Sequence, residues 1–396
     1  MAAPNPALSR APATGAWWND RRVRAIFYQM VFLAILVGAV WLLVGNTVEN
    51  LRARGLKSGF DFLPSRSGIP ISDSVLDWDP DDTFGKAYLV GILNTLRVGV
   101  LGIIFATILG TFIGIARLSN NWLISRLASV YVEAVRNIPL LLQLILLYAF
   151  VTRTLPDQLD PIVIGGGFFL SKSGLMFPLL KLEAAHYAAG AVLLASFAAM
   201  VGYNYWAKRR QDATGVSPPR LLPSLGILFL PALAVFLVMG APAEFDIATK
   251  TRFRFIGGGA VAPEFLTILT GLVIYTAAFI AEIVRSGILA VSYGQTEAAS
   301  ALGLTRGRTL RLVLLPQALR VIIPPTTSQY LNLVKNSSLA VAVGYPDVVA
   351  IEMITMNQTS RALEAILLIM AVYLTISLSI SLAMNMYNKR IALKER

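Results

Sequence analysis

The stretch that decides the fold reads GQTEAASALG and occupies residues 294–303. It is short and polar, yet it lies between two hydrophobic segments that are each long enough to cross a bilayer. Ala298, Ala299 and Ala301 are strong helix formers with little bulk, and Glu297 is favourable in the first turn of a helix. The stretch therefore predicts a compact helix with a small-residue face that another protein can approach closely.

The ends of this helix are also indicated by the sequence. Thr296 is expected to cap a helix over residues 297–302, and Gly303 suits a left-handed helix end. Thr305 is expected to cap a second helix, whose basic residues are Arg306, Arg308 and Arg311. Pro316 is expected to end or kink this second helix, because proline lacks a backbone N–H. The loop is therefore predicted to be two short helices, the second of them basic and lying on the membrane surface.

The composition indicates an all-α integral membrane protein. Of the 396 residues, 56% are hydrophobic and 14% are charged, and the mean hydropathy is +0.66. A soluble protein carries roughly 25% charged residues. The apolar residues gather in blocks of about 20, the length that spans a hydrocarbon core, and such spans must be helices because lipid offers no partners for backbone groups. Eight spans are expected, at about 26–46, 88–116, 137–155, 186–206, 222–241, 264–285, 321–344 and 363–386.

The formal charge of +12 is explained by membrane topology better than by nucleic-acid binding. Lys and Arg gather in alternate loops between the hydrophobic blocks, whereas the opposite loops are mixed or acidic. By the positive-inside rule the basic loops face the cytoplasm. Both termini (1–25 and 387–396) and the 294–303 stretch are therefore expected to be cytoplasmic, and the first apolar run is too long for a signal peptide.

The chain lacks residues that many enzyme and cofactor sites need. It has no cysteine and a single histidine, His186, so no metal site is expected. Two glycine triplets, Gly165–Gly167 and Gly257–Gly259, are expected to form flexible or tightly turned periplasmic loops, since no phosphate-binding Lys-Ser/Thr pair follows them. Without a Walker A sequence, ATP must be bound by another chain, and no cofactor is expected in this one.

A longer pattern around residues 294–303 resembles a known family. The pattern consists of Gly294-Gln295, Glu297-Ala298-Ala299, Gly303, Leu315-Pro316-Gln317-Ala318, Arg320 and Pro324. It resembles the permease signature of the polar amino acid uptake family, whose members belong to binding-protein-dependent ABC importers. Four further stretches resemble core helices of that family, at 91–96, 131–143, 281–288 and 333–339. For the alanine-rich helix alone, an ordinary linker between two spans is the alternative interpretation.

The resemblance implies a five-helix type I ABC importer permease core. The core is split into 88–150 and 264–386, and the second part contains a coupling loop over 286–320. Outside the core lie an extra transmembrane helix with a periplasmic loop at 26–87 and an insertion with two extra transmembrane helices at 151–263. Such an enlarged chain is similar to the long permease subunit of general L-amino-acid importers of the bacterial inner membrane.

The same resemblance implies a non-catalytic subunit that moves L-amino acids inward by alternating access. The implied partners are ABC ATPase subunits that hydrolyse ATP, a second homologous permease in a heterodimer, a periplasmic amino-acid-binding protein and membrane lipid. No nucleic acid is expected. The residues implied to couple to the ATPase are Gly294, Gln295, Glu297, Ala298, Ala299, Gly303 and Arg306.

The segment 321–344 is too polar to face lipid on every side. Ser328, Asn332 and Lys335 are spaced so that they share one helical face. A Lys inside a span costs at least ~2.5 kcal/mol, so it must face a cavity, another subunit or an anionic partner. We expect this face to line a water-filled substrate pathway, with Lys335 close to the substrate carboxylate; a structural Lys paired with a carboxylate is the alternative. The adjacent polar candidates are Asn336 and Ser337.

Three more polar residues are pathway candidates. Tyr275 and Glu282 lie seven residues apart and so share one face of a span, although Glu282 can instead pair with Arg285. Gln143 stands among leucines and is expected to hydrogen-bond across helices or into the pathway. The two spans of the insertion carry mostly apolar residues and are expected to face lipid or a partner rather than the pathway.

Two other function classes remain as alternatives. A secondary amino-acid transporter is expected to show inverted repeats with broken helices around midplane carboxylates, and the sequence shows neither. A membrane-embedded enzyme needs a Ser/Lys, Asp/Asp or His/Glu constellation. The single histidine, the absence of cysteine and the scattered carboxylates argue against such an enzyme.

Overall fold

The computed structural model describes residues 21–53, 59–252 and 255–391. They fall into two compact units, of which the first comprises residues up to 70, 78–89 and 351–372. The second unit comprises residues 71–77, 90–350 and 373 onward. The expected cytoplasmic ends, 1–25 and 387–396, lie partly outside the described residues.

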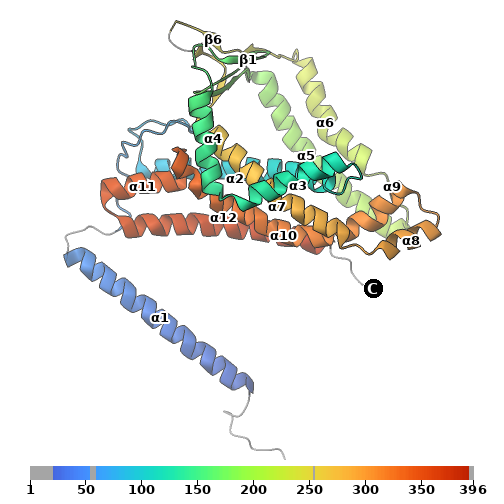
Figure 1. The fold of residues 1–396 in the computed structure, drawn as a ribbon, viewed down its shortest axis with the longest axis horizontal. Helices are drawn as coiled ribbons and strands as arrows, with labels where there is room; N and C mark the ends of the chain where they lie inside the picture. Colours follow the sequence, from blue (N-terminus) through green and yellow to red (C-terminus); the bar gives the residue numbers. More distant parts are fainter. Residues whose placement is uncertain (1–20, 54–58, 253–254, 392–396) are drawn as a thin grey trace, which may run out of the picture. The chain divides into compact units, whose positions relative to one another are not determined.

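The described residues are mostly helical (Figure 1). Six of the described helices are long and apolar enough to cross a membrane, and two bent helix pairs raise the number to eight if each pair counts as one span. The six unbroken helices are α1 (Arg21–Ala53), α2 (Phe84–Ala116), α5 (Ala184–Thr214), α6 (Leu221–Val238), α7 (Pro263–Leu289) and α12 (Ala362–Ile391). Each of the eight predicted spans therefore has a helical counterpart.

In the first unit, the chain after Gly59 is held by the turn between α11 (Val348–Thr359) and α12. Arg361 donates to the Asp61 carboxylate, with Nη2 3.0 Å from Oδ2, and the Gly59 amide donates to Glu364 Oε1 at 2.6 Å. The guanidinium of Arg361 also lies 5.4 Å from the ring centre of Phe62. A buried arginine thus fixes the loop that precedes α2 in the chain.

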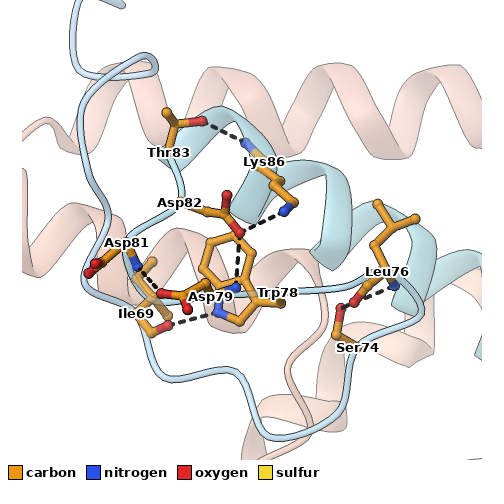
Figure 2. A network of polar contacts seen from close by, with 9 residues as sticks. All are labelled: Ile69, Ser74, Leu76, Trp78, Asp79, Asp81, Asp82, Thr83 and Lys86. Atoms are coloured by element: carbon orange, nitrogen blue, oxygen red, sulfur yellow. Dashed lines mark hydrogen bonds and ion pairs between the residues drawn. The ribbon is translucent and has the colours of Figure 1, made fainter.

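The acidic segment before α2 is satisfied by local contacts (Figure 2). The Asp82 carboxylate accepts hydrogen bonds from the Asp79 amide at 2.9 Å and from Lys86 Nζ at 2.6 Å. The Asp79 carboxylate accepts in turn from the Asp81 amide at 2.8 Å. The hydrogen bond from Lys86 lowers the pKa of Asp82. These carboxylates therefore order a turn at the start of α2.

In the second unit, α7 is the central helix. It packs against α3 (Trp122–Asn137), α4 (Leu140–Thr154) and α10 (Leu315–Asn336). α2 lies close to α7 at two glycines. A Cβ atom on Gly110 would lie 2.8 Å from the carbonyl oxygen of Ala277, and a Cβ atom on Gly114 would lie 2.7 Å from the carbonyl oxygen of Ala281. Small residues at helix crossings are typical of membrane bundles, because tight packing drives association there.

The span predicted at 137–155 corresponds to α4, and a sharp bend precedes this helix. α3 and α4 meet at an angle of 105°. Ile138 is held in extended backbone (φ −103°, ψ 129°) because it precedes Pro139, which stands at the start of α4. The bend therefore lies at the start of the predicted span, and α3, which begins at Trp122, is a separate helix.

The polar loop after α7 folds into α8 (Tyr293–Ala301) and α9 (Arg306–Thr309), followed by a π-helical turn, η2 (Leu310–Leu314). The chain then continues through α10 into a 3₁₀ turn, η3 (Ser337–Val343). Pro316 does not end the helix but occupies the first turn of α10. The Leu315 amide donates to the Leu310 carbonyl in the wider π-helical pattern. The helix therefore continues through Pro316 without a break.

The insertion contains the helical hairpin α5–α6, whose two helices pack mainly on each other. Asn204 Nδ2 donates to Ser224 Oγ at 3.0 Å between the two helices. Outside this contact, most side chains of both helices are half-buried or exposed. That these two spans face lipid or a partner rather than the pathway stays a prediction.

Short strands, which the sequence did not predict, gather at one end of α4, α5 and α6 (Figure 1). One antiparallel sheet has the order β1 (Ile162–Gly165), β2 (Phe168–Ser171), β3 (Gly174–Phe177) and β8 (Gly259–Val261), with Met176 opposite both Phe169 and Ala260. Two further pairs join β4 (Leu179–Leu180) to β5 (Phe245–Asp246) and β6 (Thr249–Lys250) to β7 (Phe255–Ile256). All three glycines of the first triplet and Gly257 and Gly258 of the second have positive φ, in agreement with the predicted tight turns, whereas Gly259 begins β8.

Candidate functional site

The predicted coupling helix forms, but it begins earlier than expected. α8 starts at Tyr293, and Ser292, in extended conformation, precedes it. The Ser292 carbonyl accepts from the Gln295 amide at 3.0 Å. Thr296 therefore lies inside the helix, and the prediction that it caps the helix was wrong. The earlier start was missed because Gly294 is a poor helix former, yet it stands in the first turn, where its cost is small.

The far end of α8 is as predicted. Gly303 adopts the left-handed conformation with φ 72°. Its amide donates to the Ser300 carbonyl at 2.9 Å, and the next amide, Leu304, donates to the Ala299 carbonyl at 3.1 Å. Thr305 precedes α9 as expected, although only its backbone carbonyl takes part in the cap, accepting from the Thr309 amide at 2.9 Å.

Most of the surface of α8 faces outward. Four coupling candidates, Gly294, Gln295, Glu297 and Ala298, are exposed, whereas Ala299 is 3% exposed and packs inward. Two large apolar side chains that sequence reasoning missed stand at the ends of the helix, Tyr293 at 74% and Leu302 at 81% exposure. The sequence feature that could have revealed them is the presence of large apolar residues in a polar loop. The exposed surface between these two side chains is made of small and polar residues, so another protein can approach it closely.

The segment α8–α9 is connected to α10 by a side-chain hydrogen bond. Gln317 Nε2 donates to Gln295 Oε1 at 3.1 Å. Arg306, the last coupling candidate, begins α9 and is exposed. In the second unit these short helices lie beside the ends of α7 and α10 (Figure 1). The exposed coupling candidates thus lie on α8, on α9 and on the turn between them.

The polar face of α10 points away from the core of its own chain. Ser328, Asn332 and Lys335 are exposed, whereas Leu333 and Val334 are buried on the other side of the helix. Lys335 makes no ion pair with any described residue. The face therefore offers one unpaired positive charge and two hydrogen-bonding side chains to whatever covers it.

The two residues that follow this face differ from it. Asn336 is half-buried at the end of α10. Ser337 is buried in η3, where its Oγ donates to the Val334 carbonyl at 2.7 Å. Within the described residues Ser337 thus serves its own helix end.

Gln143 bridges the bend between α3 and α4. Its Nε2 donates to the carbonyls of Val135 and Ile138, both at 2.8 Å. These carbonyls belong to the last turn of α3 and its cap, where the helix leaves acceptors unsatisfied. The predicted hydrogen bond across helices is therefore confirmed.

Glu282 lies in a cluster with two arginines. Arg285 Nη2 donates to Glu282 Oε1 at 2.7 Å, which confirms the predicted pair, and Arg117 donates to the other carboxylate oxygen. Tyr275 lies earlier on α7, and its ring centre is 5.0 Å from that of Phe279. The described structure thus gives both pathway candidates on α7 partners inside the chain.

Residues 102–393 match the model of the family described as binding-protein-dependent transport system inner membrane component. The chain belongs to this family.

The relatives of this permease include the general L-amino acid transport system permease protein AapQ of Rhizobium johnstonii. It is 44% identical over 396 residues, which cover 98% of this chain and 99% of AapQ. A second relative is the glutamate/glutamine/aspartate/asparagine transport system permease protein BztB of Rhodobacter capsulatus, 46% identical over 95% of this chain and 96% of BztB. A solved amino acid ABC transporter with histidines matches 78% of this chain and 95% of its own, at 20% identity and a TM-score of 0.46.

The permease also contains a polar cluster in its second unit that sequence reasoning missed. Arg97, on α2, lies with Nη1 3.0 Å from Asp73 Oδ1 and with its guanidinium 3.9 Å from the ring centre of Phe265. Asn94 Nδ2 donates to the carbonyls of Asp73 and Pro346 at 2.8 and 2.9 Å. The sequence feature that could have indicated this cluster is the presence of an arginine and an asparagine inside an apolar span. Their contacts tie the segment before α2 to the chain after η3.

Proposed function

We propose that this permease imports L-amino acids as one half of a complex driven by an ABC ATPase. The observation that carries this proposal is α8, a short helix with a small-residue face exposed between Tyr293 and Leu302. A helix of this kind buries its exposed apolar side chains when it enters a groove of another protein. The ATPase docks on this surface, and Gly294, Gln295, Glu297, Ala298, Gly303 and Arg306 are its contact candidates. Ala299 supports the helix from the inner side.

The second partner is a homologous permease subunit that covers the polar face of α10. Ser328, Asn332 and Lys335 are too polar for lipid, and they face away from their own core. A partner permease with a similar face would enclose a water-filled pathway between the two chains. Lys335 then supplies the positive charge that meets the carboxylate of the amino acid. Asn336 extends this surface toward the end of the helix.

Contacts inside the chain reduce the number of residues that we propose to line the pathway. Gln143 and Ser337 donate to backbone carbonyls of the chain, and Glu282 is neutralised by arginines. We assign these three residues to structural roles. Tyr275 is half-buried against the core and remains a candidate for the pathway wall.

The substrate class and the orientation follow from the relatives and from charge. AapQ and BztB are named as amino acid transport system permeases, and each matches nearly the full length of the chain, including the insertion. The basic loops support an orientation with both termini and α8 on the cytoplasmic side of a bacterial inner membrane. A periplasmic amino-acid-binding protein then delivers the solute from the opposite side, and ATP is bound by the partner ATPase.

The test is transport by the complete complex in proteoliposomes. ATP is supplied on the side of the ATPase, and the binding protein with a panel of labelled L-amino acids is supplied on the other. We expect uptake that requires ATP and the binding protein. Uptake that proceeds without ATP and follows an ion gradient would instead identify a secondary transporter.

A further inference from the structure

A half-open cavity of about 1070 Å³ lies in the second unit beside α8. Three stretches of chain wall it: the end of α2 with the start of α3, the end of α7 with the start of α8, and the segment from α9 into α10. Two of its lining residues, Tyr293 and Arg306, also belong to the proposed ATPase-contact surface. Its position next to the proposed coupling helix makes its occupant relevant to transport.

On each of the three walls, apolar residues lie in or next to a long helix, and polar residues occur beyond the end of that helix. On the first wall, Phe112 and Ile115 lie within the span of α2, and Ser119 and Asn120 follow the end of that helix. On the second wall, Ile288 and Leu289 end α7, and Ser292 follows them before α8. The polar lining residues thus lie beyond the ends of the long helices, where Leu118 and Ile124 also contribute apolar surface.

The third wall adds a positive charge to the polar lining residues. Ala318 and Leu314 lie toward the span of α10, and Arg306, at the start of α9, lines the outer part of the cavity. Arg308 and Arg311 are exposed on the same segment. An arginine at the interface between membrane and water attracts anionic headgroups.

We propose that this cavity binds an anionic glycerophospholipid, with its acyl chains against Phe112 and Ile115 and its phosphate at Arg306. The shape of the molecule matches the order of the walls, since it is apolar over most of its length and charged at one end. Assignment to the cytoplasmic leaflet rests on the proposed function, which places α8 in the cytoplasm. Because Ser292, Tyr293 and Thr296 also line the cavity, the lipid would contact the first turn of α8.

The experiment uses the complete complex in nanodiscs of phosphatidylcholine that contain a trace of photoreactive phosphatidylglycerol. Cross-linked peptides are identified by mass spectrometry, with labelled phosphatidylcholine as the neutral comparison. We expect the anionic probe to label the peptides that contain Phe112, Ile115 or Leu310 more strongly than the neutral probe does.

Two matched pairs of variants test the site. Arg306→Gln should reduce labelling by the anionic probe roughly fivefold, whereas Arg308→Gln, exposed on the same short helix but outside the cavity wall, should change it less than about twofold. Ile115→Trp should reduce labelling by filling the apolar part of the cavity, whereas Leu194→Trp, on the exposed surface of α5, should not.

Equal effects of the two arginine variants, or full labelling of Ile115→Trp, would overturn the proposal. So would labelling that appears only in the isolated permease, because the cavity would then be closed by a partner in the complex. Stimulation of ATP hydrolysis by the binding protein is measured on the same nanodiscs. Absence of this stimulation in the wild-type complex would count against the proposed function. The labelling pattern tests the lipid site independently of that result.

Discussion

Arg117 and Glu282 form an ion pair although 165 residues separate them in the sequence. Arg117 follows the end of α2, and Glu282 lies in α7, the helix that leads into the proposed coupling loop. Arg117 Nε also lies 3.3 Å from Ser129 Oγ on α3. The pair therefore joins three helices near the end of the bundle that carries α8.

The first prediction concerns this ion pair. Glu282→Gln should lower the free energy of unfolding by about 1–2 kcal/mol, because it removes the charge that both arginines face in a partly exposed site. The thermal unfolding midpoint of the purified complex measures the effect. Glu133→Gln is the matched control, since Glu133 is exposed and makes no ion pair with a described residue. If Glu282→Gln had the wild-type unfolding midpoint but bound substrate more weakly, Glu282 would be assigned to the pathway instead.

The second prediction concerns Lys335. Lys335→Met keeps the length of the side chain and removes its charge, so uptake should fall about tenfold or more if the ammonium meets the substrate carboxylate. Lys335→Arg should retain a larger part of the activity. Initial rates in proteoliposomes are compared at equal amounts of assembled complex. Wild-type uptake by a well-assembled Lys335→Met complex would refute the pathway role.

The third prediction concerns the glycines of α2. Gly114→Ala should destabilise the permease by about 1–3 kcal/mol, because its Cβ would lie 2.7 Å from the Ala281 carbonyl oxygen. Gly190→Ala in α5 is the control, since its Cβ would meet nothing within 4 Å. The yield of folded protein and the unfolding midpoint are measured. Tolerance of both substitutions would show that α2 and α7 are not in tight contact there.

The fourth prediction separates the pathway from the periphery. The chain has no cysteine, so an introduced cysteine reports on one position alone. Asn332→Cys should react with a water-soluble thiol reagent and be protected by substrate, whereas Leu194→Cys, which is 75% exposed on α5, should not react because lipid or a partner covers it. Substrate-protected labelling at Leu194→Cys would place the insertion in the pathway instead.

The sequence predicted the features that depend on local patterns. Eight apolar blocks, the left-handed end of α8 at Gly303 and the Glu282–Arg285 pair all depend on neighbouring residues, and all are present. The bend between Ile138 and Pro139 was local as well, but the apolar run over α4 concealed it. The start of α8 was misplaced because Gly294 made Ser292 a less obvious cap than Thr296.

Other features could not be read from local patterns. The partner of Glu282 in α2 and the glycine contacts of α2 depend on tertiary packing between distant segments. The strands of the insertion have two to four residues each, too few for a periodic pattern. The exposure of the polar face of α10 also became apparent only once the core of the second unit was formed.

The central claim is that α8 transmits the action of an ATPase. The most direct measurement is co-purification of the ATPase, together with hydrolysis stimulated by the loaded binding protein, for Glu297→Lys and Gly303→Asp. Asp212→Lys, a charge reversal at an exposed position on α5, is the control. We predict that both α8 variants insert normally but lose ATPase association or stimulation, while the control retains both. Unchanged association and stimulation in both α8 variants would contradict the account.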